Sequence, residues 1–267
     1  MDVEELKTEF GFTKFYLIND FEANGYGATI MDTTNEEKWL VLHEGKEIPH
    51  APKIIIGPGT GLGCAIMSYN TKEGDYNVHA GEGGHTEYAA TTEQEFRLRN
   101  YAIKWLKEHD NQTLLRVSTE RLTAGPALPL MYDFMREEYP DLEVICTPEA
   151  GKDRVTPESV IFGSLVTEDP LCRKVINQFF KNLAVMVGDI AIISLCYGGI
   201  YLCGGVVDGN RDYLVKEEWE FVKTLANKGR MTQRLSDIPI YVVKTPIGLD
   251  GSEQFWYLAG VNDYEEM

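Results

Sequence analysis

The feature that most constrains the fold is a glycine run, GPGTGLG at residues 57–63, which directly follows an apolar segment at residues 53–56. A dinucleotide-binding loop would lead into a helix, and a P-loop would contain Gly-Lys-Ser/Thr. The residues that follow here, 64–69, are short, mixed and prone to form a strand. We therefore predict a strand, a glycine-rich turn and a second strand. The backbone N–H groups of such a turn can converge on an anion, and a plain tight turn is the alternative.

Size and charge narrow the classes of partner. The chain has 267 residues, which suits one large domain or two modest ones. Lys and Arg number 25 against 42 Asp and Glu, a net charge of −17. Such a field repels phosphate backbones and anionic lipids, so we expect neither a nucleic acid nor a membrane as partner. The most apolar stretch, residues 182–203, contains Asp189 and several glycines, and predicts a buried helix followed by a buried strand.

The cysteines indicate a reducing compartment. None of the five has the spacing of a zinc site or a Cys-x-x-Cys motif. We expect reduced, buried thiols in a cytoplasmic protein. The acidic, amphipathic N-terminus does not have the pattern of a signal peptide. The cysteines are Cys64, Cys146, Cys172, Cys196 and Cys203.

Hydrophobic periodicity and capping signals predict the other elements. Helices are expected at residues 3–10 (ending at Gly11), 21–30, from a capping box at 92–95 onward, and at 127–138, 156–162, 170–195 and 252–259. Strands are expected at residues 15–18, 53–56, 64–69, 75–79, 200–203 and 238–243. Strands and helices mix without strict alternation, which favours a layered α/β or α+β fold.

Asp20 is the first candidate for chemistry. It follows the predicted strand at residues 15–18, at the position where α/β sheets usually place ligands. There its carboxylate could accept a proton from a substrate hydroxyl, and Asn19 beside it offers an amide. The alternative is that Asp20 only caps the helix that begins at Phe21.

Three further positions combine polar side chains or bare backbone with glycine. Glu82 and His85 project from a glycine-rich segment and suit a polyol, whose hydroxyls both donate and accept. They are too few for a closed zinc site, and we expect no metal ligands. Glu120 precedes a Gly-Pro corner, with a surface salt bridge as the alternative. Gly204 and Gly205 end a predicted strand and would let a flat ring approach the backbone, or simply form a tight turn.

Taken in order, these motifs resemble the bacterial-type glucokinases, sugar kinases of the actin-like ATPase superfamily. The resemblance covers nearly the whole chain, and the zinc-binding cysteine cluster of a related group is missing. The matching strings are INDF (18–21), GPGTGLG (57–63), GEGGH (81–85), ERLTAGP (120–126) and GGIYLCGGV (198–206).

The resemblance implies a two-lobed, ribonuclease H-like α/β fold and the ATP-dependent conversion of glucose to glucose 6-phosphate, the entry to glycolysis. Asp20 matches the family's general base, and ATP and Mg²⁺ are the implied cofactors. The sugar-binding positions would be Asn19, Asp20, Glu82, His85 and Glu120. The nucleotide-binding positions would be Gly57, Pro58, Gly59, Thr60, Gly61, Gly204 and Gly205. The implied partners are glucose, ATP and a second copy of the chain in a homodimer.

One part of the family pattern is missing. Glucokinases open with an Asp-x-Gly-Gly-Thr phosphate loop, and this sequence contains no such string. We therefore expect residues 1–20 to be the remnant of an incomplete small N-terminal lobe. A hinge near residues 20–52 would connect it to a large lobe at residues 53–267, which carries the sugar and nucleotide contacts. The alternative to an active kinase is a glucose-binding pseudokinase or sensor without efficient phosphoryl transfer.

Overall fold

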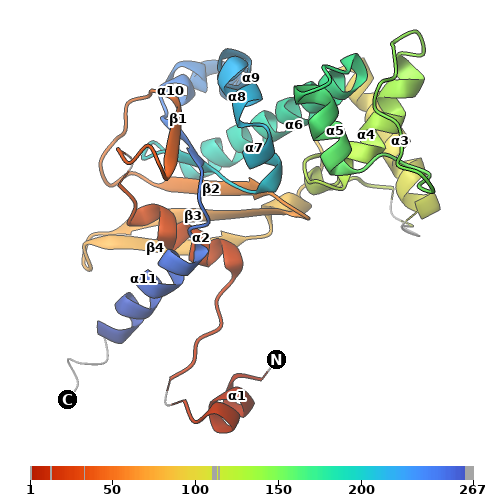
Figure 1. Cartoon of the computed structure of the whole chain (residues 1–267). Coiled ribbons are helices and arrows are strands. Elements are labelled where there is room, and N and C mark those ends of the chain that lie inside the picture. The colour runs from red at the N-terminus through yellow and green to blue at the C-terminus, as the bar shows by residue number, and fades with distance from the viewer. Residues whose placement is uncertain (1, 13, 33, 110–112, 114, 262–267) are drawn as a thin grey trace.

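The computed structural model describes residues 2–12, 14–32, 34–109, 113 and 115–261, and is built around one mixed sheet (Figure 1). The sheet has six strands in the order β1-β6-β5-β2-β3-β4. Strands β2, β5 and β6 run parallel, and the remaining pairs are antiparallel. The strands are β1 (Trp39–His43), β2 (Lys53–Pro58), β3 (Leu62–Asn70), β4 (Asp75–Gly81), β5 (Ile200–Leu202) and β6 (Ile240–Val243).

The central strand β2 shows why an unbroken apolar run can form a strand. Ile54 and Ile56 face one hydrophobic cluster, and Ile55 faces another on the opposite side of the sheet. All three are at most 1% exposed. A strand covered on both faces needs apolar side chains at every position rather than at alternate ones. The prediction of a strand, a turn and a second strand at the glycine run is confirmed by the antiparallel pairing of β2 with β3.

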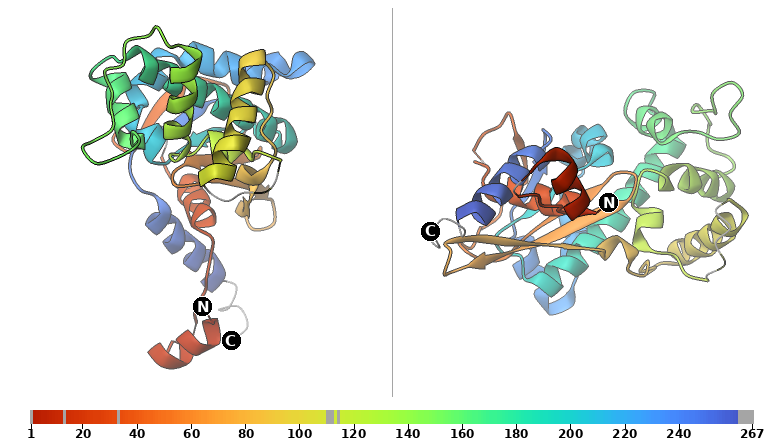
Figure 2. Two further views of the ribbon diagram at one scale, coloured as in Figure 1. Left: turned by 90° about the vertical axis from the view of Figure 1, so that its right-hand side faces the viewer. Right: turned by 90° about the horizontal axis from the view of Figure 1, so that it is seen from below.

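Helices cover the two faces of this sheet (Figures 1 and 2). The larger cluster packs α6 (Pro170–Ser194) against the sheet, with α3 (Glu93–His109), α4 (Ala127–Glu138) and α5 (Pro157–Leu165) grouped around the first half of α6. The opposite face carries α2 (Asp20–Thr29) and α11 (Gly248–Val261). The short elements are α1 (Val3–Phe10), α7 (Gly205–Gly209), α8 (Arg211–Lys216), α9 (Glu218–Ala226), α10 (Thr232–Ser236), η1 (Gly83–His85), η2 (Thr119–Leu122) and η3 (Gly229–Met231).

Helix α6 is the long apolar helix expected from the sequence. By length and composition it could cross a membrane, but 67% of its most apolar window is buried inside the protein. Its apolar side chains therefore pack in the core between the sheet and the surrounding helices.

The capping signals are confirmed at two helices. Gly11 ends α1 with a φ of +68°, a conformation that glycine adopts without steric cost. At α3, the backbone N–H of Thr92 donates to Glu95, and the N–H of Glu95 donates to the Thr92 hydroxyl. This is the reciprocal pair of bonds that defines a capping box.

The prediction of a strand at residues 15–18 is wrong. The structure describes all four residues, and they form an irregular extended segment between α1 and α2. Leu17 is 63% exposed, and the Tyr16 ring packs edge-on against Phe255 and Trp256 of α11. Apolar side chains alone do not make a strand, because a strand also needs a neighbour for its backbone hydrogen bonds. Asp20 is accordingly the first residue of α2 and does not follow a strand.

The sequence also gave no indication of β1, nor of helices α7 to α10. Strand β1 pairs with β6 through a register shift between Val41 and His43. Both α2 and β1 lie within residues 20–52 and pack on the sheet formed by later residues. The division of the chain into residues 1–20, a hinge and residues 53–267 stays a prediction.

Candidate functional site

A cleft of about 600 Å³ opens where the parallel strands β2, β5 and β6 end. Each of these strands leads from its carboxyl end into residues that line the cleft, which is where α/β sheets usually bind ligands. The start of α2, the end of β4 and Glu120 of η2 complete the lining. Most of the predicted site residues, which are far apart in the sequence, therefore meet in one place.

Asn19 and Asp20 line this cleft from the N-terminus of α2. Asn19 is the N-cap, and its Oδ1 accepts from the backbone N–H of Phe21 at 2.8 Å and of Glu22 at 3.4 Å. The Oδ1 of Asp20 accepts from the same Phe21 N–H at 2.9 Å. The capping role that the sequence allowed for Asp20 therefore belongs to Asn19. The Asp20 side chain stands in an exposed position at the cleft.

Cys203 lines the cleft as an uncharged thiol. Burial, with a smaller contribution from the negative charge of Asp20, raises the pKa of the Cys203 thiol to about 12. Cys203 is therefore a protonated thiol at neutral pH rather than a nucleophilic thiolate.

The glycine turn between β2 and β3 is attached to the corner that carries Glu120. The N–H of Gly59 donates to the carbonyl oxygen of Gly61 at 2.8 Å, which closes the turn. The carbonyl oxygen of Gly59 accepts from the N–H of Gly125, also at 2.8 Å. Residues 57 and 59–63 line the cleft, whereas Pro58 is buried and is not part of the lining. The prediction that Pro58 contacts the nucleotide thus has no support from its position.

Glu82, His85 and Glu120 form a polar group at the other end of the cleft. The Nδ1 of His85 lies 3.3 Å from Oε1 of Glu120, and its Nε2 lies 3.6 Å from Oε2 of Glu82. Glu82 and Glu120 line the cleft itself, and His85 lies between them on η1. Two carboxylates and an imidazole in contact offer both acceptors and a donor to a polyhydroxyl ligand.

Gly204 and Gly205 form the turn from β5 into α7, so the tight-turn interpretation is correct for the backbone. Gly204 has a φ of +92°, and a Cβ there would lie 2.5 Å from the carbonyl oxygen of Pro58. Only glycine allows the two strand ends to approach so closely. A Cβ on Gly205 would meet no atom within 4 Å, so this residue presents bare backbone to the cleft.

Sequence reasoning missed several lining residues. They include Phe21 and Asn24 of α2, Asp208 of α7, Val243 at the end of β6 and the loop after it, residues 244–247. The loop could have been found by applying to residues 238–243 the rule that was applied to Asp20, namely that ligands lie beyond the carboxyl ends of parallel strands. Asp208 carried no such signal, because the sequence did not indicate α7.

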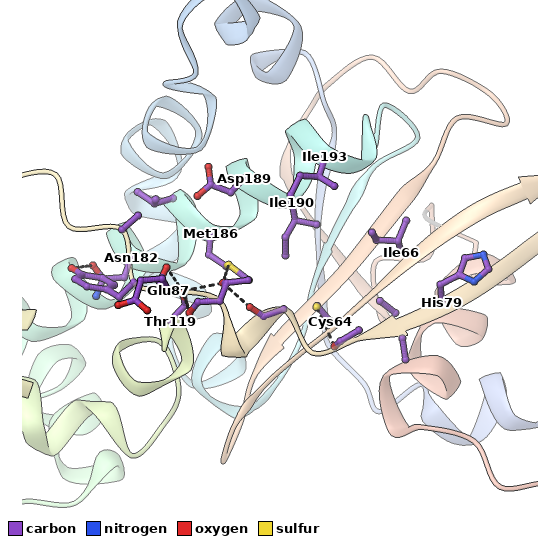
Figure 3. Close-up of a pocket in the computed structure, with 18 of the residues that line it drawn as sticks. Cys64, Ile66, His79, Glu87, Thr119, Asn182, Met186, Asp189, Ile190 and Ile193 are labelled. Atoms are coloured by element: carbon purple, nitrogen blue, oxygen red, sulfur yellow. Dashed lines mark hydrogen bonds between the residues drawn. The ribbon is translucent and has the colours of Figure 1, made fainter. Parts of the chain in front are cut away.

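A second cavity of about 380 Å³ lies behind η1, between β3, β4 and α6 (Figure 3). Ile66 on β3 and Ile190 and Ile193 on α6 form its apolar walls, and Cys64 lines both this cavity and the cleft. At its deep end, Asn182 is already hydrogen-bonded to Tyr88, Gln178 and the carbonyl oxygen of Leu122. The polar side chain of Asn182 is therefore already partnered within the protein.

The cleft residues fit a magnesium-bound nucleotide. Within the described part of the chain, no group of three or more His, Cys, Asp or Glu side chains could hold a metal ion. Mg²⁺ needs no such cage, because it commonly binds through one or two carboxylates together with substrate phosphates and water. Asp208 is exposed in the cleft, beside the Gly204–Gly205 backbone.

Comparisons with known proteins agree on one family. The family model for glucokinase matches residues 1–257. The chain is 34% identical to the glucokinase of Nostoc punctiforme, over 94% of this chain and 74% of that protein. A glucokinase structure from an Antarctic psychrotroph is similar, with a TM-score of 0.76 and 25% identity, over 96% of this chain and 73% of that chain.

A more distant structure shares the fold. It is a ROK family glucokinase from Streptomyces griseus in complex with glucose and AMPPNP, with a TM-score of 0.59 and 17% identity. The match covers 93% of this chain and 70% of that one.

Proposed function

This chain belongs to the glucokinase family, and from that premise we propose that its cleft transfers the γ-phosphoryl group of ATP to the 6-hydroxyl of glucose, with Asp20 as general base. The fold is the mixed α/β fold of the actin-like sugar kinases. The observation that carries the proposal is that Asp20, Glu82, Glu120, the glycine turn and the Gly204–Gly205 backbone line one cleft, with His85 in contact with both glutamates although it is not part of the lining.

Glucose is proposed to bind between Asn19 and the Glu82–His85–Glu120 group. Each hydroxyl of a sugar both donates and accepts a hydrogen bond, and the carboxylates accept while the imidazole and the Asn19 amide can donate. The Oδ1 of Asn19 is already used in capping α2, which leaves its NH₂ group available for the sugar. A site that hydrogen-bonds hydroxyls discriminates more sharply than apolar contact can.

Asp20 is proposed to accept the proton of the 6-hydroxyl. As that proton moves to the carboxylate, the hydroxyl oxygen forms a bond to the γ-phosphorus, and the bond from phosphorus to the bridging oxygen of ADP breaks. Phosphoryl transfer depends mainly on positioning and charge stabilisation. The hydrogen bond from the Phe21 N–H orients the Asp20 carboxylate for this role.

The nucleotide is proposed to lie along the strand ends. Gly57, Gly59, Thr60 and Gly61 line the cleft, and the turn would bind phosphate oxygens through backbone N–H groups other than that of Gly59, which is already bonded to the Gly61 carbonyl oxygen. Gly204 and Gly205 would contact the adenosine. Mg²⁺ bound with the nucleotide would neutralise phosphate charge, and we propose that Asp208, which lines the cleft and pairs with Arg211, would hold it. The Streptomyces griseus structure, which shares the fold, contains glucose together with AMPPNP, and we propose glucose and ATP as the corresponding pair here.

A coupled assay for glucose 6-phosphate with Mg²⁺ and ATP tests this function, alongside the thermal unfolding of the same protein with and without glucose. We expect glucose-dependent ATP consumption and a higher midpoint of unfolding with glucose, because a ligand that binds only the folded state stabilises it. Stabilisation by glucose without any turnover would instead support the glucose-binding pseudokinase, which the family membership does not favour. If glucose causes neither turnover nor stabilisation, both the kinase and the glucose-binding pseudokinase are rejected.

We also propose a cytoplasmic homodimer. All five cysteines are free, as is usual in a reducing compartment. Large apolar side chains are exposed on helices, including Ile193 of α6 at 78% and Leu249 of α11 at 86%. The two helices cover opposite faces of the sheet, and a contiguous exposed apolar patch around either side chain would mark the interface of the proposed dimer. Light scattering after size exclusion measures the mass directly, and a mass of 30.1 kDa would mean a monomer.

A further inference from the structure

The side chain of Phe21 lies on the backbone of the glycine turn. A Cβ built on Gly63 would overlap the Phe21 ring, and one on Gly57 would lie 3.0 Å from its Cζ. The ring therefore occupies the space that the missing side chains of two glycines leave free. This contact joins the N-terminus of α2 to both strands of the β2–β3 turn.

The backbone of the same residue holds the proposed base. Its N–H is shared between Oδ1 of Asn19 and Oδ1 of Asp20. A shift of the Phe21 ring would therefore move the donor that orients the Asp20 carboxylate. The ring is partly buried and packs against the hydrophobic cluster on the α2 face of the sheet, so the core holds it on its other side.

Cys203, directly after β5, borders the same space beside Gly57. A Cβ on Gly57 would lie 2.6 Å from the Sγ of Cys203. The space beside Gly57 is thus bordered by both the Phe21 ring and the end of β5. The proposed base, the phosphate turn and the proposed adenosine contact therefore share one packed junction, with Phe21 as its aromatic member.

We propose that Phe21 is a positioning residue for phosphoryl transfer, whose ring, seated on Gly57 and Gly63, fixes the separation between the Asp20 carboxylate and the phosphate turn. This inference rests on the proposed function, because it assigns Asp20 as the base. It also explains glycine at position 63, where alanine would fit a strand equally well but would push the ring away. The ring itself touches no reacting atom in this role.

The test compares Phe21→Leu, Gly63→Ala and the double variant with Phe255→Leu as the matched control. Phe255 is another partly buried aromatic residue of the same cluster, and its ring packs against Tyr26 in the second half of α2 and against Tyr16, not against the glycine turn. We measure the glucose dissociation constant by calorimetry, and kcat together with the single-turnover rate. Hydrogen exchange at the amides of residues 20–24 reports on the N-terminal turn of α2 without any need for turnover.

We expect Phe21→Leu to lower the single-turnover rate at least about tenfold, since small misplacements of reacting groups carry costs of that size. Glucose affinity should stay within about twofold of the wild type, and amide exchange at residues 20–24 should accelerate. Gly63→Ala should lower the single-turnover rate further. The double variant should recover part of that rate, because leucine at position 21 is smaller than phenylalanine and removes the overlap with the new Cβ. Phe255→Leu should leave rate and exchange at these residues near wild type.

The proposal is overturned if Phe21→Leu keeps its rate and its exchange pattern, or if Phe255→Leu reproduces both changes. Additive losses in the double variant would also contradict it, because the two positions would then act independently. If the wild-type chain shows no turnover, the proposed function fails, and the exchange data still decide whether Phe21 holds the N-terminal turn of α2.

Discussion

The Nδ1 of His85 lies 3.3 Å from Oε1 of Glu120, although the two residues belong to separate 3-10 turns, η1 and η2. Backbone contacts hold these turns together: the N–H of Thr119 donates to the carbonyl oxygen of Thr86 at 2.8 Å, and Glu87 pairs with Ser118 in an isolated bridge. The proposed sugar contacts are therefore placed by the backbone rather than by the flexibility of long side chains. This rigidity is what a site needs to recognise the pattern of hydroxyls on a sugar.

Replacement of His85 by Gln should weaken glucose binding more than catalysis. Loss of one hydrogen bond to a neutral hydroxyl costs about 0.5–1.5 kcal/mol, which corresponds to roughly a 2- to 13-fold rise in KM for glucose. We expect kcat to change much less, since His85 is not assigned to proton transfer. Steady-state kinetics and calorimetry measure the two effects separately. His79→Gln is the control, because His79 bonds to Ser68 on the neighbouring strand, whereas His85 contacts Glu82 and Glu120 of the cleft lining. A large fall in kcat with unchanged KM would contradict the assignment.

Replacement of Asp20 by Asn should abolish most of the turnover. General-base catalysis contributes about 10²- to 10⁴-fold, so we expect kcat to fall by at least about 10²-fold while glucose still binds. The amide of Asn can accept the Phe21 N–H bond but cannot take a proton at neutral pH. Asp32→Asn is the control, because Asp32 accepts bonds from Thr34 in an exposed loop outside the cleft. Near wild-type turnover in Asp20→Asn would exclude this residue as the base.

Alanine substitutions at positions 204 and 205 test two different roles: backbone strain at Gly204 and contact with the nucleotide at Gly205. Gly204→Ala places a Cβ at a φ of +92° and 2.5 Å from the Pro58 carbonyl oxygen, and should lower the free energy of unfolding by about 1–3 kcal/mol. Gly205→Ala meets no atom within 4 Å and should stay within about 0.5 kcal/mol of the wild type. If the adenosine rests on this backbone, Gly205→Ala should nevertheless weaken ATP binding. Urea unfolding measures the stability of both variants, and nucleotide titration measures their affinity for ATP. Equal losses of stability at both positions would contradict the close packing of Gly204 against Pro58.

Glu95 should make the stability of the protein depend on pH in the acidic range. Burial opposes its ionisation, but donors from Lys181 and Thr91 outweigh that effect and hold the pKa of Glu95 at about 2, below its usual 4.5. A lowered folded pKa stabilises the native state above pH 4.5, and this contribution disappears as pH falls toward 2. The difference corresponds to about 3 kcal/mol at neutral pH.

Urea unfolding of the wild type and of Glu95→Gln from pH 7 downward measures this contribution. We expect the gap in unfolding free energy between them to be largest at neutral pH and to narrow below pH 4.5. Glu87→Gln is the control, since the exposed pair of Glu87 with Arg116 should contribute less than about 1 kcal/mol. A gap that stays constant with pH would show that Glu95 acts by packing alone.

Local sequence patterns predicted most of the regular elements. The bounds of α4, expected at residues 127–138, are confirmed residue for residue, as are the Gly11 terminus of α1 and the Thr92–Glu95 capping box. These features depend on interactions within one or two helical turns, which the sequence records directly. The strand prediction at residues 15–18 was wrong, because the apolar composition of the segment indicates burial but does not show whether a neighbouring strand is available for pairing. The short helices α7 to α10 lack a long apolar period and gave no signal.

By itself, the sequence determined which chemical groups this protein has and what the backbone does next to each: glycines at the turns, caps at the helices and the motif strings that place it among the glucokinases. Only the tertiary structure decided that Asp20, Glu120 and Gly204 line one cleft, that Asn19 rather than Asp20 caps α2, and that the Phe21 ring rests on Gly63. The reason is physical: caps and turns arise from contacts between neighbours in the chain, whereas the cleft arises from the order in which distant strands pair in the sheet.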